Sequence, residues 1–321
     1  MRTIELKAFA IDAIAKANIC TEEDARSKAF RLLRHAPLIS FEEFLYAIAS
    51  RVQDTSVTTL PHIHDFGEPS FPMALNENWI FEIIAWNMRS TSMHEHTFEG
   101  AFKVVTGPQI LNGYEFKSSS HPHNGVEVGT LKWTDTRVLN VGDCEIISTG
   151  ERGIHSLWSL EKPALLYVLR TVGDGEGWDY LWPSLRFRRS SVERIYTSRE
   201  KYLDALEAFS EKIYVSCLNK LSEQIGLNNK IYLAIQRFIR PDNTAKWPAL
   251  FDAEERDNDA LSRALIDGLS HLDHFLRFNE LRGAATSPYE LATLALSYHS
   301  HLQKPDLVRM LHAHLCEAKL I

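Results

Sequence analysis

Apolar residues follow three different periods along the chain. Over residues 3–52 they recur every three or four positions, the spacing of a helix with one apolar face. Residues 79–172 instead hold short runs rich in β-branched and aromatic side chains, separated by turn signals such as Asn124-Gly125. The helical period returns beyond residue 191. The pattern predicts an α+β protein with an N-terminal helical segment (residues 1–58), a central antiparallel β-barrel (residues 59–190) and a C-terminal all-helical region (residues 191–321).

Composition and charge narrow the class of protein. The 321 residues are 45% hydrophobic and 24% charged, the balance of an ordinary globular protein with a sizeable core. The formal net charge of -7 argues against a surface that binds phosphates, so no nucleic-acid partner is expected.

Cysteine usage and the N-terminal sequence bear on location. The first twenty residues lack the apolar core and cleavage site of a signal peptide, and no apolar run in the chain reaches about 18 residues. The four cysteines are scattered without a CxxC pair, which is typical of a reduced cytosolic protein rather than a zinc ribbon. We therefore expect a soluble, cytoplasmic protein with no membrane partner. The cysteines are Cys20, Cys144, Cys217 and Cys316.

The pattern His-x-His occurs five times, and its context separates the copies. Two copies lie in predicted helices, where side chains at i and i+2 diverge by about 200° and do not easily share an ion. Two more lie in loops, where a solvated or a functional role stays open. The fifth, His94 and His96, lies next to predicted strands, in which i and i+2 face the same side about 7 Å apart. The other four are His62/His64, His121/His123, His299/His301 and His312/His314.

A third histidine completes a candidate metal site. About 60 residues after the pair, a predicted strand enters a Gly-rich turn that presents His155. Three neutral imidazoles around Fe(II), or another first-row divalent ion, leave coordination positions open for substrate and O₂. The alternative is that His155 is a hydrogen-bonded histidine of the barrel.

Residues 79–172 resemble a cupin, and among the cupins they are most similar to thiol dioxygenases of the cysteine dioxygenase type. The resemblance rests on FEIIAW, then MHEHT, then the strand FKVVTG that ends at Gly107, and finally GIHSLWSLEKPALLYVLR around His155. Such enzymes hold Fe(II) with three histidines, which the resemblance maps to His94, His96 and His155. It implies a cupin-type barrel with a mononuclear non-haem iron site and O₂ as co-substrate.

The chain departs from that family at several positions. Gly100 stands where some members carry a cysteine cross-linked to tyrosine, although others also have glycine. The Ser-His-Tyr triad of the family falls here on Leu166, Val168 and Arg170, and the arginine that anchors the substrate carboxylate has no clear counterpart in PSFPMALNEN. The resemblance therefore carries over the metal ligands but not the thiol substrate.

Three other residues are candidates for the missing chemistry. Arg170 lies on the predicted inner face, where its guanidinium can hold a carboxylate or phosphate, or else form an internal salt bridge. Tyr167 is a candidate acid or a group that orients O₂, with a core tyrosine as the alternative. Glu99 would be a fourth ligand or a general base if the turn at Gly100 rotates it inward.

The sequence thus predicts an Fe(II)-dependent cupin oxygenase that acts on a small polar metabolite, which binds the metal through a heteroatom. Two alternatives stay open, a metal-dependent isomerase or lyase that does not use O₂, and a ligand-sensing cupin without catalysis. The long C-terminal helical region exceeds what a minimal barrel needs, and it is expected to cover the barrel mouth, bind a partner or form a homodimer.

Overall fold

The computed structural model describes most of the chain. The described residues are 2–19, 24–53, 70–86, 91–173, 177–188, 202, 203, 206, 210–238, 258–285, 287–300 and 305–321. His62 and His64, one of the two loop pairs, lie outside the described residues.

Three helices form the N-terminal segment, α1 (Arg2–Ile19), α2 (Ala25–Arg34) and α3 (Phe41–Gln53). Two of them begin at side chains that satisfy free backbone N–H groups. Asp24 accepts from the N–H of Ser27 at 2.8 Å, and Ser40 and Glu43 accept from each other's N–H groups in a capping box. These caps explain why both helices start where the sequence changes from loop to amphipathic period.

Among the described residues, the central region contains eleven strands. They run from residue 70 to residue 188, inside the segment predicted to be the barrel. The strands are β1 (Ser70–Leu75), β2 (Trp79–Trp86), β3 (Met93–His94), β4 (Gly100–Thr106), β5 (Gln109–His123), β6 (Val126–Leu139), β7 (Cys144–Ile147), β8 (His155–Ser159), β9 (Ala164–Thr171), β10 (Trp178–Leu181) and β11 (Leu185–Arg188).

Antiparallel pairing organises these strands into two units. One is a five-stranded sheet in the order β1-β2-β9-β4-β7, and the other closes on itself in the order β10-β11-β6-β5-β8-β3. An apolar cluster joins the two units, because it contains Ile84, Phe102 and Val168 from the first and Leu111 and Leu157 from the second. The predicted α+β fold class is confirmed: a closed antiparallel barrel lies between N-terminal and C-terminal helices.

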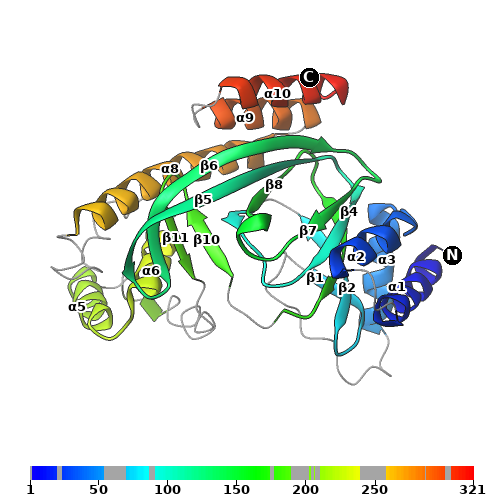
Figure 1. Ribbon diagram of the computed structural model, residues 1–321, viewed down its shortest axis with the longest axis horizontal. Coiled ribbons are helices and arrows are strands. Elements are labelled where there is room, and N and C mark those ends of the chain that lie inside the picture. Colours follow the sequence, from blue (N-terminus) through cyan, green and yellow to red (C-terminus); the bar gives the residue numbers. More distant parts are fainter. Residues whose placement is uncertain are drawn as a thin grey trace.

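The N-terminal helices cover the outer face of the five-stranded sheet (Figure 1). Leu6 and Leu33 of the helices pack with Phe81 and Tyr167 of β2 and β9, and all four are buried. On these two strands alternate residues therefore face opposite layers, one toward the helices and one toward the other strands.

The C-terminal helices lie along the long β5–β6 hairpin (Figure 1). An apolar cluster holds them there, with Ile110 and Trp158 from strands and Leu291, Tyr298 and Leu311 from helices. The helices of this cluster pack against strands of the barrel, while cover of the barrel mouth, a partner and a homodimer stay predictions. Within the described ranges the helices are α5 (Glu211–Ser222), α6 (Leu227–Phe238), α8 (Asp259–Ala284), α9 (Pro288–Ser300) and α10 (Pro305–Glu317).

The length and the hydropathy of the helices decide whether they can cross a membrane. Within the described ranges, none of them combines the length and the apolar character that crossing a bilayer requires.

Gly100 is required by the close approach of β4 to β9. A Cβ atom at this position would lie 2.8 Å from the Cα of Arg170 and even closer to the carbonyl oxygen of Leu169. Both are backbone atoms of a central strand, so they cannot move aside cheaply. At Gly113, in contrast, the nearest atom to such a Cβ is the Cβ of Asp135 at 3.4 Å, an ordinary contact.

We therefore expect Gly100→Ala to lower the free energy of unfolding by about 1–3 kcal/mol through overpacking. Gly113→Ala is the matched control and should stay within about 0.5 kcal/mol of the parent. Chemical denaturation of the three proteins measures the difference. Equal stability of both variants would show that β9 does not approach β4 this closely.

Candidate metal centre

Strand pairing brings His94 and His155 together. β3 pairs with β8 so that His94 lies directly opposite His155. Residues opposite each other in an antiparallel pair have Cβ atoms about 4.5–5.5 Å apart, so the two imidazoles are neighbours. His96 follows just after β3, where it forms an isolated bridge with Thr149 and its carbonyl accepts from the N–H of Gly150 at 3.0 Å.

The three imidazoles converge on one point. One ligand atom from each of His94, His96 and His155 lies within 4.8 Å of the other two. The ring centroids are 4.7 Å apart for His94 and His96, 4.8 Å for His94 and His155, and 4.9 Å for His96 and His155. Among the residues that the structure describes, this is the group of histidine, cysteine or acidic side chains with the spacing to hold a metal ion.

Backbone carbonyls select the tautomer of two of the rings. Nδ1 of His94 lies 2.8 Å from the carbonyl oxygen of Ser92, and Nδ1 of His155 lies 2.8 Å from that of Gly153. A carbonyl oxygen only accepts hydrogen bonds, so each Nδ1 carries the hydrogen and the ring lone pair is on Nε2. This is how metal-binding histidines are usually oriented.

Burial keeps His155 neutral. Burial and, to a smaller extent, the nearby His94 lower the pKa of His155 to about 3, against an opposing effect of the Gly153 carbonyl. A neutral imidazole is the form that binds a metal, so His155 is available over the whole physiological pH range. The donor set therefore fits a first-row divalent ion.

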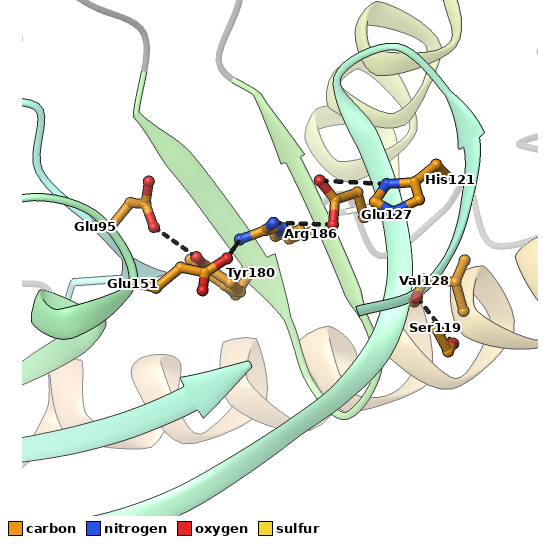
Figure 2. Close-up of polar contacts among 8 residues, drawn as sticks. All are labelled: Glu95, Ser119, His121, Glu127, Val128, Glu151, Tyr180 and Arg186. Atoms are coloured by element: carbon orange, nitrogen blue, oxygen red, sulfur yellow. Dashed lines mark hydrogen bonds and ion pairs between the residues drawn. The ribbon is translucent and has the colours of Figure 1, made fainter. Parts of the chain in front are cut away.

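A network of polar side chains supports both segments that carry the histidines (Figure 2). The hydroxyl of Tyr180 donates to Glu95, between His94 and His96, at 2.7 Å. Arg186 donates to Glu151 at 2.6 Å and to Glu127 at 2.8 Å. Glu151 belongs to the 3-10 helix η1 (Gly150–Gly153), whose last carbonyl orients the ring of His155. The network thus holds the backbone on both sides of the centre.

Glu95, Tyr180 and Arg186 had no role in the predicted site. Burial raises the pKa of Glu95, and the hydrogen bond from Tyr180 partly offsets that rise. Arg186 also lies over the rings of Trp178 and Phe116, at 4.4 Å and 4.9 Å from their centroids. In the sequence, only the position of Glu95 between His94 and His96 pointed to this network. Its partner Tyr180 lies 85 positions away along the chain and could not be found from local spacing.

Arg170 forms an internal ion pair. It lies on the inner face as predicted, but its Nε donates to Glu82 at 2.5 Å, and Ser70 donates to the other oxygen of the same carboxylate. The side chain of Glu82 is fully buried and that of Arg170 is 7% exposed. Of the two roles considered for Arg170, the structure shows the salt bridge and not a free guanidinium. Its guanidinium also lies 4.5 Å from the ring centroid of Phe98, which in turn contacts His96.

Tyr167 and Glu99 are directed away from the three histidines. Tyr167 packs in the cluster shared with the N-terminal helices, while its neighbours Leu166 and Val168 belong to the inner cluster. Tyr167 is therefore a core tyrosine, the alternative that the sequence left open beside an acid or a group that orients O₂. Burial raises the pKa of its hydroxyl. Glu99 lies with its carboxylate 3.6 Å from Arg26 of α2 and outside the metal-ligand group, so the turn at Gly100 does not rotate it inward.

The other histidine pairs, where the structure describes them, lie elsewhere, and His301 lies outside the described residues. His121 forms an ion pair with Glu127 at 3.5 Å, on the outer end of the polar network (Figure 2). His299 and His312 lie on helices α9 and α10, as expected for the two helical pairs. None of these joins the metal-ligand group among the described residues.

Comparison with known proteins leaves the family open. No protein-family model and no curated protein sequence matches the chain. Among solved structures it is similar to a cupin-2 domain containing protein from Shewanella frigidimarina, with 12% identity over 42% of this chain and 94% of that chain and a TM-score of 0.24. It is also similar to a hydroquinone 1,2-dioxygenase from a Sphingomonas species with 4-hydroxybenzoate bound, with 11% identity over 38% and 73% of the two chains and a TM-score of 0.24. A DMSP lyase from Ruegeria pomeroyi gives 11% identity over 47% and 74% and a TM-score of 0.26. Similarity at this level assigns no activity.

The Arg170–Glu82 pair yields a stability prediction. Arg170→Met leaves the buried carboxylate of Glu82 without its cation, so the free energy of unfolding should fall by about 3–5 kcal/mol. The double variant with Glu82→Met removes both charges, and it should regain most of that loss. Denaturation of the parent, the single and the double variant forms the cycle. A single variant as stable as the parent would contradict a structural role for Arg170.

Proposed function

We propose that the chain is a mononuclear metal-dependent enzyme of the cupin type, with His94, His96 and His155 as the metal ligands. More specifically, we propose a non-haem Fe(II)-dependent oxygenase that acts on a small polar metabolite. The observation that carries the proposal is the convergence of three imidazoles within 4.8 Å inside a β-barrel. Two of them direct their Nδ1 hydrogens at backbone carbonyls, which places the lone pair of each ring on Nε2, the atom that would bind an ion.

The ligand set favours a catalytic over a structural site. A first-row divalent ion held by three neutral imidazoles keeps open positions, at which a substrate heteroatom and O₂ can bind, whereas structural zinc sites fill four positions with protein ligands. No carboxylate or thiolate among the described residues joins the three histidines. The protein's own part is to hold the rings in place and to keep them neutral.

The surroundings of the rings are largely apolar. Phe98 packs against the ring of His96 with centroids 4.5 Å apart, and it belongs to the inner cluster with Ile147 and Leu157. Apolar walls limit the access of water and strengthen electrostatic interactions within the site. The charges of Arg170 and Glu82 neutralise each other, so this pair is not assigned to substrate binding.

Metal content tests the ligands directly. We expect the untagged protein, loaded anaerobically with Fe(II), to retain one ion per chain by elemental analysis. His94→Ala, His96→Ala and His155→Ala should each lose it, because two imidazoles bind far more weakly than three. His312→Ala, on helix α10, is the control and should keep the metal. Equal metal in the parent and all variants would rule out this site.

The choice of metal separates the oxygenase from a non-oxidative enzyme. With a set of small hydroxylated, amino and thiol compounds, the Fe(II) form should consume O₂ and the Zn(II) form should not, because Zn(II) has no redox chemistry. An oxygen electrode records the rate. Turnover by the Zn(II) form under nitrogen would instead identify an isomerase or lyase, and tight metal binding without any turnover would indicate a sensor.

The hydrogen bond from Tyr180 to Glu95 should affect metal affinity. Tyr180→Phe removes only the hydroxyl, so we expect about tenfold weaker Fe(II) binding in a chelator competition, with one ion still bound at saturation. Thr136→Val is the control, because it removes a buried hydroxyl that donates to Asn112 at 2.9 Å and not to Glu95 between the two ligands. The same loss of affinity in both variants would show a general loosening of the barrel rather than support of the centre.

A further inference from the structure

A cavity lies on the other side of the strands that carry the metal ligands. It is enclosed by residues of β3, β5, β8 and β10 and by helices α8 and α9, and it has a volume of about 60 Å³. Met93 and Ser156 line it, whereas the next residues along their strands, His94 and His155, belong to the metal centre. Alternate residues of a strand face opposite sides, so the cavity and the centre are separated by one layer of backbone.

One buried polar atom in this cavity has no partner. Nε2 of His299 is inaccessible to solvent and makes no hydrogen bond among the described residues, and the whole residue is fully buried. Its Nδ1 lies 2.6 Å from the carbonyl oxygen of Ala295 and therefore carries the hydrogen. Burial lowers the pKa of His299 to about 4, so the ring is neutral and Nε2 is a hydrogen-bond acceptor. A buried acceptor without a donor destabilises a protein, so a molecule that donates a hydrogen bond to this atom would remove that cost.

Four other polar groups of the cavity already have partners. The hydroxyls of Tyr114 and Ser156 share a hydrogen bond of 3.1 Å, and Nε2 of His271 and the hydroxyl of Tyr298 share one of 2.7 Å. Within the described part of the chain, no Asp, Glu, Lys or Arg lines the cavity. A molecule in the cavity therefore meets the unfilled acceptor Nε2 of His299. Among the described residues it meets no charged Asp, Glu, Lys or Arg side chain.

The walls are aromatic. Trp158 stacks on Tyr298 with centroids 5.4 Å apart, and Trp182 lies 6.5 Å from Tyr114 and 6.2 Å from His271. Such walls favour a flat ring over a branched aliphatic molecule. Ser92 is exposed and marks the side on which the cavity meets solvent. One water needs roughly 10–15 Å³ on this measure, so the volume suits several waters or one small organic molecule.

We propose that this cavity is a binding site for a small, uncharged aromatic molecule that carries one O–H or N–H donor, with the donor directed at Nε2 of His299. The cavity shares Tyr180 with the surroundings of the metal centre, but binding there does not require the proposed oxygenase activity.

Phenol and toluene are suitable probes, because they are nearly isosteric and only phenol has a donor. By isothermal titration calorimetry on the full chain, we expect phenol to bind about tenfold more tightly than toluene, the difference that one hydrogen bond makes. His299→Phe keeps an aromatic ring but removes the acceptor, so it should reduce phenol to the affinity of toluene. Equal affinity of both probes for the parent, or binding of neither, would overturn the proposal and leave only trapped water.

A spectroscopic readout avoids dependence on the variant, which is buried and liable to misfold. In the ¹⁵N-labelled parent, phenol should shift the Nε2 resonance of His299 and toluene should not, because only phenol donates to it. A phenol-induced shift confined to other histidines would contradict the assignment. The His155→Ala variant, with the metal centre disabled, should still bind phenol, so that failure of this proposal and failure of the oxygenase proposal give different results.

Discussion

The pairing of β3 with its two neighbours is the interaction on which the centre depends. β3 contains only Met93 and His94, so its own ladder is short, yet it sets His94 opposite His155 on one side and opposite Asp179 on the other. So few backbone hydrogen bonds would fray alone. Side chains supply the difference: the hydroxyl of Thr91 accepts from the N–H of Leu157 at 2.7 Å, and Glu95 accepts from Tyr180. The position of two imidazoles is thus a property of several strands rather than of one motif.

The barrel interior keeps its charges paired. Glu82, Arg170 and Ser70 come from three neighbouring strands and satisfy one another in a region with almost no access to water. Burying a single charge there would be costly, whereas the pair is tolerated because each group has its partner. Its consequence for function is that the polar chemistry of the interior is concentrated on the histidines, while Phe98 separates the ion pair from the ring of His96.

Periodicity and local spacing were sufficient to predict the barrel, its flanking helices and the three histidines. That worked because His-x-His next to a strand fixes the relative direction of two side chains locally. For Tyr167, Arg170 and Glu99 the sequence left two roles open, and contacts between distant segments decide where each side chain lies. Tyr167 faces helices that lie more than 110 residues earlier, and Glu99 faces Arg26, 73 positions away. Contacts of this range do not appear in a strand pattern. For Arg170 the inner face was predicted correctly, and only the pairing of β2 with β9 reveals Glu82 beside it. A glutamate inside the buried run WIFEIIAW was the one available signal.

The backbone contact at Gly100 also limits the chemical evolution of the site. Some thiol dioxygenases, the family that the sequence motifs alone suggest, carry a cysteine joined covalently to a tyrosine at the matching position. Here β9 occupies the space of any side chain, beginning with its first carbon atom, so a thioether bridge has no place to form. To accommodate a thioether bridge, β4 and β9 would first have to move apart. A single substitution at Gly100 would not be enough. Any adjustment of the centre's reactivity must therefore come through reversible contacts around the imidazoles.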